Sequence, residues 1–466
     1  MTRGLRRLGE AVVHAFAEFL TLPVVIIAGF LLLAAGTSYL DQSRLAQVEP
    51  LHAWLRNRFF RNPQATSDLL ATVAGSIITI TSITFSLLLL TVQQAAAALT
   101  HQVYDQFLRR RANQVYFGFF VGLALYTLVI LATVNPPFNP VFGASVALLL
   151  AVLALTLMIV LLYTTINQMR PAVVIDSIHD HVLLARKGQL DFLARVRPAP
   201  RLDRAGTAVT SRVDGYLVGL HLERLAGAVR AAPTEVEIVL LVPIGAYIAF
   251  GDRVAEVRTD DPAAGAALVP EVVKCLRIEP QRDLATDPGY GIEQLAVIAW
   301  TSISTAKSDP SPGLLVIRSL RDLLSRWSLD PPERPADAPR PEPVPLVYED
   351  DVPRQVMDSL ETLTVVASES MQAQTEAELV RALTLLFDRI SPELQRRAED
   401  LIRRSLSALG DHVLTAELDS ALTGLIVTLD RAGRQETAQA VRTARDRLAQ
   451  SVGRLGSRAT RAGGDG

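Results

Sequence analysis

Four long apolar runs fill most of the first third of the chain. None of them contains a charged residue, and they lie at residues 19–40, 69–94, 114–134 and 141–166. Each run is close to the ~20 apolar residues with which an α-helix crosses the hydrocarbon core of a bilayer. The pattern therefore predicts four transmembrane helices within a membrane domain that covers residues 1–169. Prolines at residues 135–140, NPPFNP, separate the last two helices and predict a helical hairpin.

Basic residues beside the runs predict their orientation. Arg3, Arg6 and Arg7 precede the first run, Arg109, Arg110 and Arg111 separate the second from the third, and Arg170 follows the fourth. Because Lys and Arg collect on the cytoplasmic side of membrane proteins, we expect a multi-pass protein of the cytoplasmic (inner) membrane with both termini in the cytoplasm. The loop before the second run is a partial conflict, since its segment LHAWLRNRFFRN is rich in arginine. Its interleaved aromatic and basic residues are typical of an amphipathic helix on the outer membrane surface.

The second apolar run carries an unusual number of polar side chains. On a helical wheel most of them fall on one sector, which we call the hydroxyl stripe: Thr72, Ser76, Thr79, Ser82, Ser86 and Gln93. Small hydroxyl residues often line the contacts between membrane helices, and this interpretation is favoured. The alternative is a polar conduit, formed inside one subunit or at the axis of a homo-oligomer.

The third run contains two glycines at the spacing that allows close helix packing. Gly118 and Gly122 form a GxxxG pattern, in which the absence of side chains lets a second helix approach the backbone. We therefore expect a helix contact at these two positions.

The remainder of the chain predicts a cytosolic part of mixed architecture. Residues 170–327 read as an α/β domain that is rich in strands at 207–257, where VPIGAYIAFGDRVAEV predicts a hairpin within a small β-barrel-like unit. This hairpin resembles those of lipoyl and biotinyl carrier domains but lacks their Met-Lys turn, so we expect no cofactor. A Pro-rich linker (328–347), a C-terminal helical bundle (348–455) and a flexible tail (456–466) complete the predicted domains.

Three stretches carry sequence features that hydropathy alone does not explain. They are TITSITFSLLLLTVQQ with YDQFLRRRANQVYFGFFVGLALYTLVIL, then DGYLVGLHLERL with GAYIAFGDRVAEV, and finally RIEPQRDLATDPGYGIEQLAVIAWTSISTAKSDPSPG. Together they resemble a bacterial membrane protein family known as domain of unknown function 2254, of which the chain is identified as a divergent member. Arg282-Asp283 and Ser308-Asp309-Pro310 stand where the family pattern has Gln-Asp and Asn-Asp-Pro. The resemblance implies a membrane protein and no particular activity.

Candidate chemistry is sparse. Arg282, Asp283 and Asp309 predict a possible polar pocket, although acids that precede proline more often start turns and cap helices. Asp176, His179 and Asp180 share a helix face with a possible metal-binding geometry, but a solvated helix surface is the favoured interpretation and we expect no metal site. Nucleotide-binding, nucleophile-elbow and zinc-protease motifs are absent from the sequence, so we expect no catalytic residues and no enzyme.

The amino-acid composition limits the classes of binding partner that we expect. The formal net charge of −2 gives no reason to expect a nucleic-acid partner, and the single cysteine, Cys275, excludes an intrachain disulfide. We expect the lipid bilayer and further copies of the chain as partners, with a cytosolic protein or small ligand as a possible addition. The hydroxyl stripe favours a channel-like or permeation protein, and the alternative is a membrane-tethered sensor or scaffold.

Overall fold

The structure is a computed structural model that describes residues 2–43, 49–98, 111–168, 170–304, 309–329, 343–409 and 413–450. The chain forms two compact units, Met1–Arg170 and Pro171–Gly466. Arg109 and Arg110, most of the predicted Pro-rich linker at 328–347 and the predicted tail at 456–466 lie outside the described residues.

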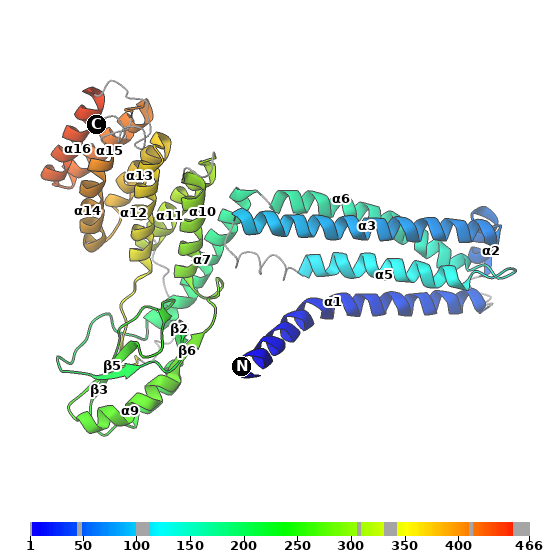
Figure 1. Ribbon diagram of the computed structural model, residues 1–466, viewed down its shortest axis with the longest axis horizontal. Helices are drawn as coiled ribbons and strands as arrows, with labels where there is room; N and C mark the ends of the chain where they lie inside the picture. Colours follow the sequence, from blue (N-terminus) through cyan, green and yellow to red (C-terminus); the bar gives the residue numbers. More distant parts are fainter. Residues whose placement is uncertain are drawn as a thin grey trace. The chain divides into compact units, whose positions relative to one another are not determined.

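Long helices make up the first unit (Figure 1). They are α1 (Thr2–Gln42), α2 (Glu49–Arg58), α3 (Pro63–Ala98), α5 (Arg111–Thr133) and α6 (Val141–Gln168). Four of them contain stretches long and apolar enough to cross a membrane: Leu20–Gln42, Pro63–Leu87, Gln114–Thr133 and Val141–Thr164. The part of the chain that the structure describes therefore contains four helices that are long and apolar enough to span a membrane, at the four predicted runs.

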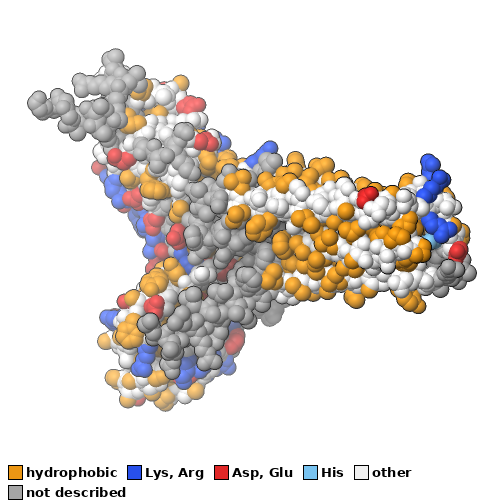
Figure 2. Space-filling view, turned by 45° about the vertical axis from the view of Figure 1, so that its right-hand side comes forward, with side chains coloured by type: hydrophobic (Ala, Val, Ile, Leu, Met, Phe, Trp, Pro, Cys, Tyr) orange, Lys and Arg blue, Asp and Glu red, His pale blue; other side chains and the backbone are white. Residues whose placement is uncertain are grey.

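Outward-facing apolar side chains cover this unit between its ends. Figure 2 shows hydrophobic side chains over the visible face of the long helices, with Lys and Arg gathered at the end that carries α2. In α2 and the residues after it, Trp54 and Phe59 are exposed beside Arg56 and Arg58. Aromatic and basic side chains together are typical of the membrane–water interface.

The tightest helix contact in the first unit joins α1 to α5. A Cβ atom added at Gly118 would lie 2.9 Å from the Cα of Pro23, and one added at Gly122 would lie 2.5 Å from the ring of Phe30. Phe30 also packs edge-on against Phe119, with ring centroids 5.5 Å apart. Gly118 thus lies where the α1 backbone approaches closely, and Gly122 leaves room for the ring of Phe30, so both positions of the GxxxG pattern lie in the contact with α1.

The second unit begins with α7 (Pro171–Leu193), which is followed by the strands. One sheet has the order β1-β5-β3-β7, and the other has the order β4-β2-β6. Their bounds are β1 (Thr207–Thr210), β2 (Gly215–Leu220), β3 (Val236–Leu240), β4 (Tyr247–Ile248), β5 (Arg253–Thr259), β6 (Leu276–Glu279) and β7 (Leu346–Val347). Pairing is antiparallel except between β3 and β7.

Both sheets are open, and the described residues form no closed barrel, so the barrel-like unit is not confirmed. The hairpin predicted at 242–257 does not form, because its two arms join different sheets: β4 pairs with β2, whereas β5 pairs with β1 and β3. Turns at Gly245 and Gly251, both with positive φ, make this division possible. The sheets and helices α8 (Leu222–Arg230) and α9 (Pro262–Cys275) enclose one apolar core, in which Cys275 is a buried free thiol.

Helices complete the second unit. They are α10 (Pro288–Ile303), α11 (Ser311–Leu329), α12 (Val352–Glu369), α13 (Ala373–Phe387), α14 (Pro392–Leu409), α15 (Ala416–Arg431) and α16 (Gln435–Gln450). α10 packs against α7, α11 and α12, and α13 packs against α11 and α15. The C-terminal helices therefore share a continuous set of contacts with those that precede them. β7 comes from the end of the predicted linker, which reaches into the sheet.

The α1–α5 contact predicts the effect of enlarging Gly118. In Gly118→Val the new side chain meets the Pro23 backbone, which cannot move aside as a flexible side chain would. We expect a loss of about 1–3 kcal/mol of stability, the usual cost of overpacking, measured as a lower Tm of the detergent-solubilised protein. Gly29→Val in α1 is the control, because a Cβ at Gly29 has no neighbour within 4 Å. Equal Tm values for the two variants would contradict the close contact.

Candidate functional site

The hydroxyl stripe lies on the outer surface of the first unit. Thr72, Ser76, Thr79, Ser82 and Ser86 are all exposed, and the side chain of Gln93 lies outside the described side chains. The opposite face of α3 is buried against neighbouring helices through Leu70, Ala74, Ile77, Ile80 and Thr84. The described part of the stripe therefore does not line a space inside one chain, and it does not pack against the chain's own described helices.

Most hydroxyls of the stripe are satisfied within α3 itself. The hydroxyls of Thr72, Ser76, Thr79 and Ser86 each donate to the carbonyl oxygen four residues earlier, at 2.8–3.0 Å. Such bonds remove the cost of exposing a hydroxyl to hydrocarbon. The stripe is consequently compatible with lipid as well as with a second protein surface.

A polar cluster at one end of the first unit was not anticipated from the sequence. The buried carboxylate of Asp41, at the end of α1, accepts hydrogen bonds from the backbone N–H groups of Phe142 (2.8 Å) and Gly143 (2.9 Å) in the first turn of α6. His52 Nε2 of α2 lies 3.6 Å from the same carboxylate, and the hydroxyl of Tyr126 donates to the carbonyl of Gly143. The signal in the sequence was an acid placed directly at the end of an apolar run.

In the second unit, Arg282 is the centre of a partly buried polar network. Its Nε donates to Asp287 Oδ2 (2.7 Å), its Nη1 donates to Glu293 Oε2 (2.6 Å), and its guanidinium lies 4.9 Å from the ring centroid of Tyr290. Burial raises the pKa of Tyr290 to about 12. Asp287 also accepts from the N–H of Tyr290 and so caps α10.

The network joins the sheets to the helices. A Cβ at Gly245, whose φ is +95°, would lie 2.7 Å from Arg282 Nη2 and 2.9 Å from Asp287 Oδ2. Only glycine allows the turn between β3 and β4 to approach the ion pair this closely.

The structure does not gather Arg282, Asp283 and Asp309 around one pocket. Asp283 is exposed and accepts a hydrogen bond from the N–H of Ala285, whereas Asp309 follows the far end of α10 and accepts from the N–H of Ser311. Hydrogen bonding to Ser311 holds the pKa of Asp309 below its usual value. Both acids thus stabilise turns, as the capping alternative expects.

The predicted helical face with Asp176, His179 and Asp180 contacts α11 through His179. His179 Nε2 lies 3.1 Å from Asp322 Oδ2 of α11, and His181 Nδ1 lies 2.6 Å from the carbonyl oxygen of Ser177. Among the described residues, no group of three His, Cys, Asp or Glu side chains has a metal-binding arrangement.

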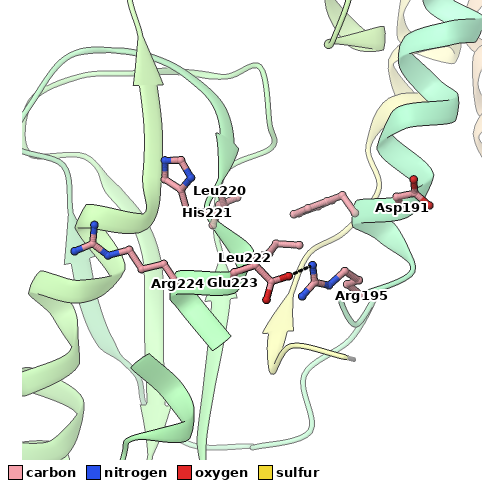
Figure 3. A pocket seen from close by; sticks show the side chains of 8 residues that line it. Asp191, Arg195, Leu220, His221, Leu222, Glu223 and Arg224 are labelled. Carbon is pink, nitrogen blue, oxygen red and sulfur yellow. Dashed lines mark hydrogen bonds and ion pairs between the residues drawn. The ribbon is translucent and has the colours of Figure 1, made fainter. Parts of the chain in front are cut away.

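A cavity of about 650 Å³ that is largely open to solvent lies between the end of α7 and the junction of β2 with α8 (Figure 3). Its apolar lining comes from Phe192, Leu220 and Leu222. Its charged or titratable lining comes from Asp191, Arg195, His221, Glu223 and Arg224. Figure 3 shows Asp191 and Arg195 on the α7 side and His221, Glu223 and Arg224 on the opposite side.

Ion pairs shape the rim of this cavity. Arg195 Nη1 donates to Glu223 Oε1 at 2.6 Å, and this bond lowers the pKa of Glu223, which stays ionised. On the other side, Arg224 Nη2 lies 3.4 Å from Glu271, whose second oxygen accepts from Lys274 at 2.5 Å. Asp191, Glu223 and Glu271 thus balance the charges of Arg195, Arg224 and Lys274, and Arg224 keeps only a long contact to a carboxylate that it shares with Lys274.

A second cavity, of about 440 Å³, lies among α7, α11, α12 and the start of α14. Arg186, which is buried, makes a bidentate pair with Asp350 at 2.8 and 2.5 Å and lies over the ring of Trp327. Arg354 contacts Glu349 and Glu393. These mutual pairings stabilise the helix packing and leave little unpaired charge for a ligand.

Four membrane-spanning helices followed by a compact α/β unit define this protein as a multi-span membrane protein. The sequence profile of the family described as "Predicted membrane protein (DUF2254)" matches residues 17–375. The chain belongs to this family, as its resemblance indicated.

Curated relatives come from mycobacteria. The chain is 26% identical over 280 residues to the uncharacterised protein Rv1290c of Mycobacterium tuberculosis and, equally, to the uncharacterised protein Mb1321c of Mycobacterium bovis. The match covers 56% of this chain and 52% of each relative, so the chain spans about half the length of these relatives. No solved structure matches the chain.

A buried carboxyl group in the helical part of the second unit also escaped sequence reasoning. Glu376 lies in the first turn of α13, which packs against α11, α12 and α15. The side chain is buried and its Oε1 has no hydrogen-bond partner among the described residues. Burial raises its pKa to about 8, because the charged form loses its hydration.

Glu376 predicts a pH-dependent stability. Its pKa in the folded state lies above the value of 4.5 for the unfolded chain, so the folded state binds more protons. The free energy of unfolding should fall as pH rises between these two values, by about 1.4 kcal/mol per pH unit for one proton. We expect Glu376→Gln to raise the Tm at about pH 8 more than at about pH 5, in thermal unfolding of the full chain.

Glu417→Gln is the matched control, because Glu417 occupies the first turn of α15 but is exposed. Identical pH dependence of Tm in wild type and Glu376→Gln would show that Glu376 does not titrate in this range.

Proposed function

We propose that this protein is a membrane-anchored binding protein whose second unit takes a small molecule with an apolar part and an anionic group. The observation that carries the proposal is the cavity beside α8. Its volume of about 650 Å³ falls within the range of small-molecule sites, ~300–1,000 Å³. Phe192, Leu220 and Leu222 offer an apolar surface, and a charged rim surrounds it.

The anionic group is argued from Arg224 at the rim, whose side chain is 51% exposed and lies 3.4 Å from its carboxylate partner. Glu223 is already paired with Arg195, while Arg224 shares its carboxylate partner with Lys274. A carboxylate or phosphate beside Arg224 and His221 supplies the charge-assisted hydrogen bonds that the shared Glu271, 3.4 Å away, does not saturate. The arrangement corresponds to a sensor or receptor that monitors a metabolite.

The side of the membrane on which the second unit lies is argued from the basic residues that flank the spans. We infer that the first unit crosses the cytoplasmic membrane with both termini in the cytoplasm, because arginines flank the cytoplasmic ends of the spans in this orientation. The second unit then faces the cytosol, so its ligand is a cytosolic small molecule.

Ligand-induced stabilisation tests the binding function. Full-length protein in lipid nanodiscs is heated with a panel of aromatic carboxylates, short-chain acyl carboxylates and sugar phosphates, and with their neutral analogues. A ligand at 100 times its Kd adds about 2.7 kcal/mol of stability and should raise the Tm, whereas its neutral analogue should not. Arg224→Gln should weaken this response about tenfold in Kd, the effect of losing roughly 1.4 kcal/mol.

Arg277→Gln is the control, because Arg277 lies on β6, pairs with Glu279 at 2.8 Å and does not line the cavity. The proposal fails if no anionic compound raises the Tm, or if Arg224→Gln responds like wild type.

We also propose permeation as a second candidate function, favoured by the outward hydroxyl stripe of α3. The stripe lies on the exterior of one chain, so conduction requires several copies that bring their α3 helices together around an axis. A homo-oligomer of this kind places Thr79 and Ser86 along a shared polar surface.

Ion flux through proteoliposomes tests this second function. Thr79→Leu and Ser86→Leu remove hydroxyls from the stripe and should reduce flux by at least about tenfold if these groups solvate an ion, equivalent to roughly 1.4 kcal/mol. Thr156→Leu in α6 is the control, since it removes an exposed hydroxyl that also donates to its own helix. Flux that is absent, or equally altered by all three variants, would rule out a conducting stripe.

A further inference from the structure

Helix α2 is held at one end of the membrane-spanning helices by the chain itself. The first apolar stretch ends at Gln42 and the second begins at Pro63, so α2 lies between two points at which the chain meets the apolar layer. Phe60 is buried in the core of the first unit, and its carbonyl oxygen accepts a hydrogen bond from Asn139 Nδ2 at 2.8 Å. The segment from α2 to residue 61 is therefore fixed at the boundary between hydrocarbon and water.

Apolar and basic side chains share the exposed face of this segment. Leu55 turns inward and packs against the core of the unit. Leu51 (52% exposed), Trp54 (58%) and Arg58 follow one another at spacings of three and four residues, so they lie on one helix face. Trp54 also packs edge-on against the exposed Phe59, with ring centroids 5.8 Å apart. The exposed set, which we call the α2 patch, consists of Leu51, Trp54, Arg56, Arg58, Phe59 and Arg61.

The arginines of the α2 patch have no carboxylate partner. Arg56, Arg58 and Arg61 are exposed, and none of them forms an ion pair with another described residue. The Nε of Arg61 donates to the carbonyl oxygen of Asn57, which leaves its charge uncompensated. Figure 2 shows basic side chains gathered at this end of the unit. Guanidinium groups bind phosphate through pairs of N–H donors, so the patch offers donors of the kind that a phosphate takes.

Acids in this part of the chain are engaged elsewhere. The carboxylate of Asp41 is buried and caps α6, and the carboxylate of Asp68 accepts a hydrogen bond from Gln64 Nε2 at 3.1 Å. Glu49 lies in the first turn of α2, where a negative charge suits the positive end of the helix dipole. The phosphates of the membrane surface are therefore the anions that this position supplies to the three arginines.

We infer that the α2 patch binds the phosphate groups of anionic phospholipids. Arg58 and Arg61 contact the phosphates, while Trp54 and Phe59 lie at the level where headgroups meet acyl chains. Anionic lipids are preferred because no amine in their headgroup compensates the phosphate charge. The contact is made in whichever leaflet faces the loop between the first two spans, and it is independent of the cavity beside α8.

Quenching of Trp54 by brominated lipid tests this preference in the full-length protein. Nanodiscs contain phosphatidylcholine and phosphatidylglycerol in equal amounts, with bromine on the acyl chains of one class or the other. The emission of Trp54 is obtained by subtracting the spectrum of Trp54→Phe, which cancels Trp300 and Trp327. We expect brominated phosphatidylglycerol to quench it more strongly, because anionic lipid should be enriched about fivefold for each arginine, equivalent to roughly 1 kcal/mol.

The double variant Arg58→Gln and Arg61→Gln should lose most of this preference, while both lipids still quench Trp54. The matched control is Arg396→Gln with Arg447→Gln, because these arginines of α14 and α16 are also exposed and form no ion pair with a described residue. It should keep the wild-type preference.

Several outcomes would overturn the inference. Equal quenching of wild type by the two lipids shows that the arginines select no anionic headgroup, and a preference that survives in the double variant shows that other groups cause it. Absence of quenching by either lipid places Trp54 in water. A preference that inorganic phosphate abolishes at constant ionic strength assigns the arginines to a soluble anion instead of a lipid.

Discussion

The first unit is governed by one constraint, which is that hydrocarbon supplies no hydrogen-bond partners. Many of the polar groups described there are satisfied within the chain, although the Thr84 hydroxyl and Asn139 Oδ1 have no hydrogen-bond partner among the described residues. Thr79 donates to the carbonyl of Gly75, and Asp41 accepts from two backbone N–H groups at the start of α6. Helix α1 has two roles in this unit. It packs along α5 at Gly118, and the carboxylate in its last turn caps α6.

Features that depend on local sequence were predictable. Apolar runs of sufficient length gave four helices that are long and apolar enough to span a membrane, and the strand-rich stretch predicted at 207–257 contains β1 to β4 and most of β5. The helical wheel grouped Thr79 and Ser86 correctly, because periodicity fixes which side chains share a face. It could not state what that face meets, since this depends on how α3 packs against α5 and α6, and the structure turns the stripe outward.

Features that depend on distant partners were missed. Arg282 was singled out, but its partners are Asp287, Glu293 and the glycine turn at Gly245, which lies 37 residues earlier by number. Neighbouring N–H groups satisfy Asp283 and Asp309, which leaves neither for a shared pocket. The prediction of a barrel-like unit was not confirmed for a related reason. Hydropathy locates strands, whereas the order in which strands pair determines whether a sheet closes. The cavity beside α8 forms where the end of α7 lies next to β2, and no local sequence pattern predicts that contact.

Strand β7 has a consequence for how the chain is made. It pairs with β3 on one side, and Arg197 bonds to it on the other, so residues separated by more than a hundred positions complete one sheet. During synthesis, β3 leaves the ribosome well before Leu346 and Val347 exist. Its edge must stay unpaired while α10 and α11 are translated, and open edges invite pairing with other nascent chains. A chain that ends before residue 347 would therefore be an aggregation-prone intermediate with an open β3 edge rather than a smaller folded unit.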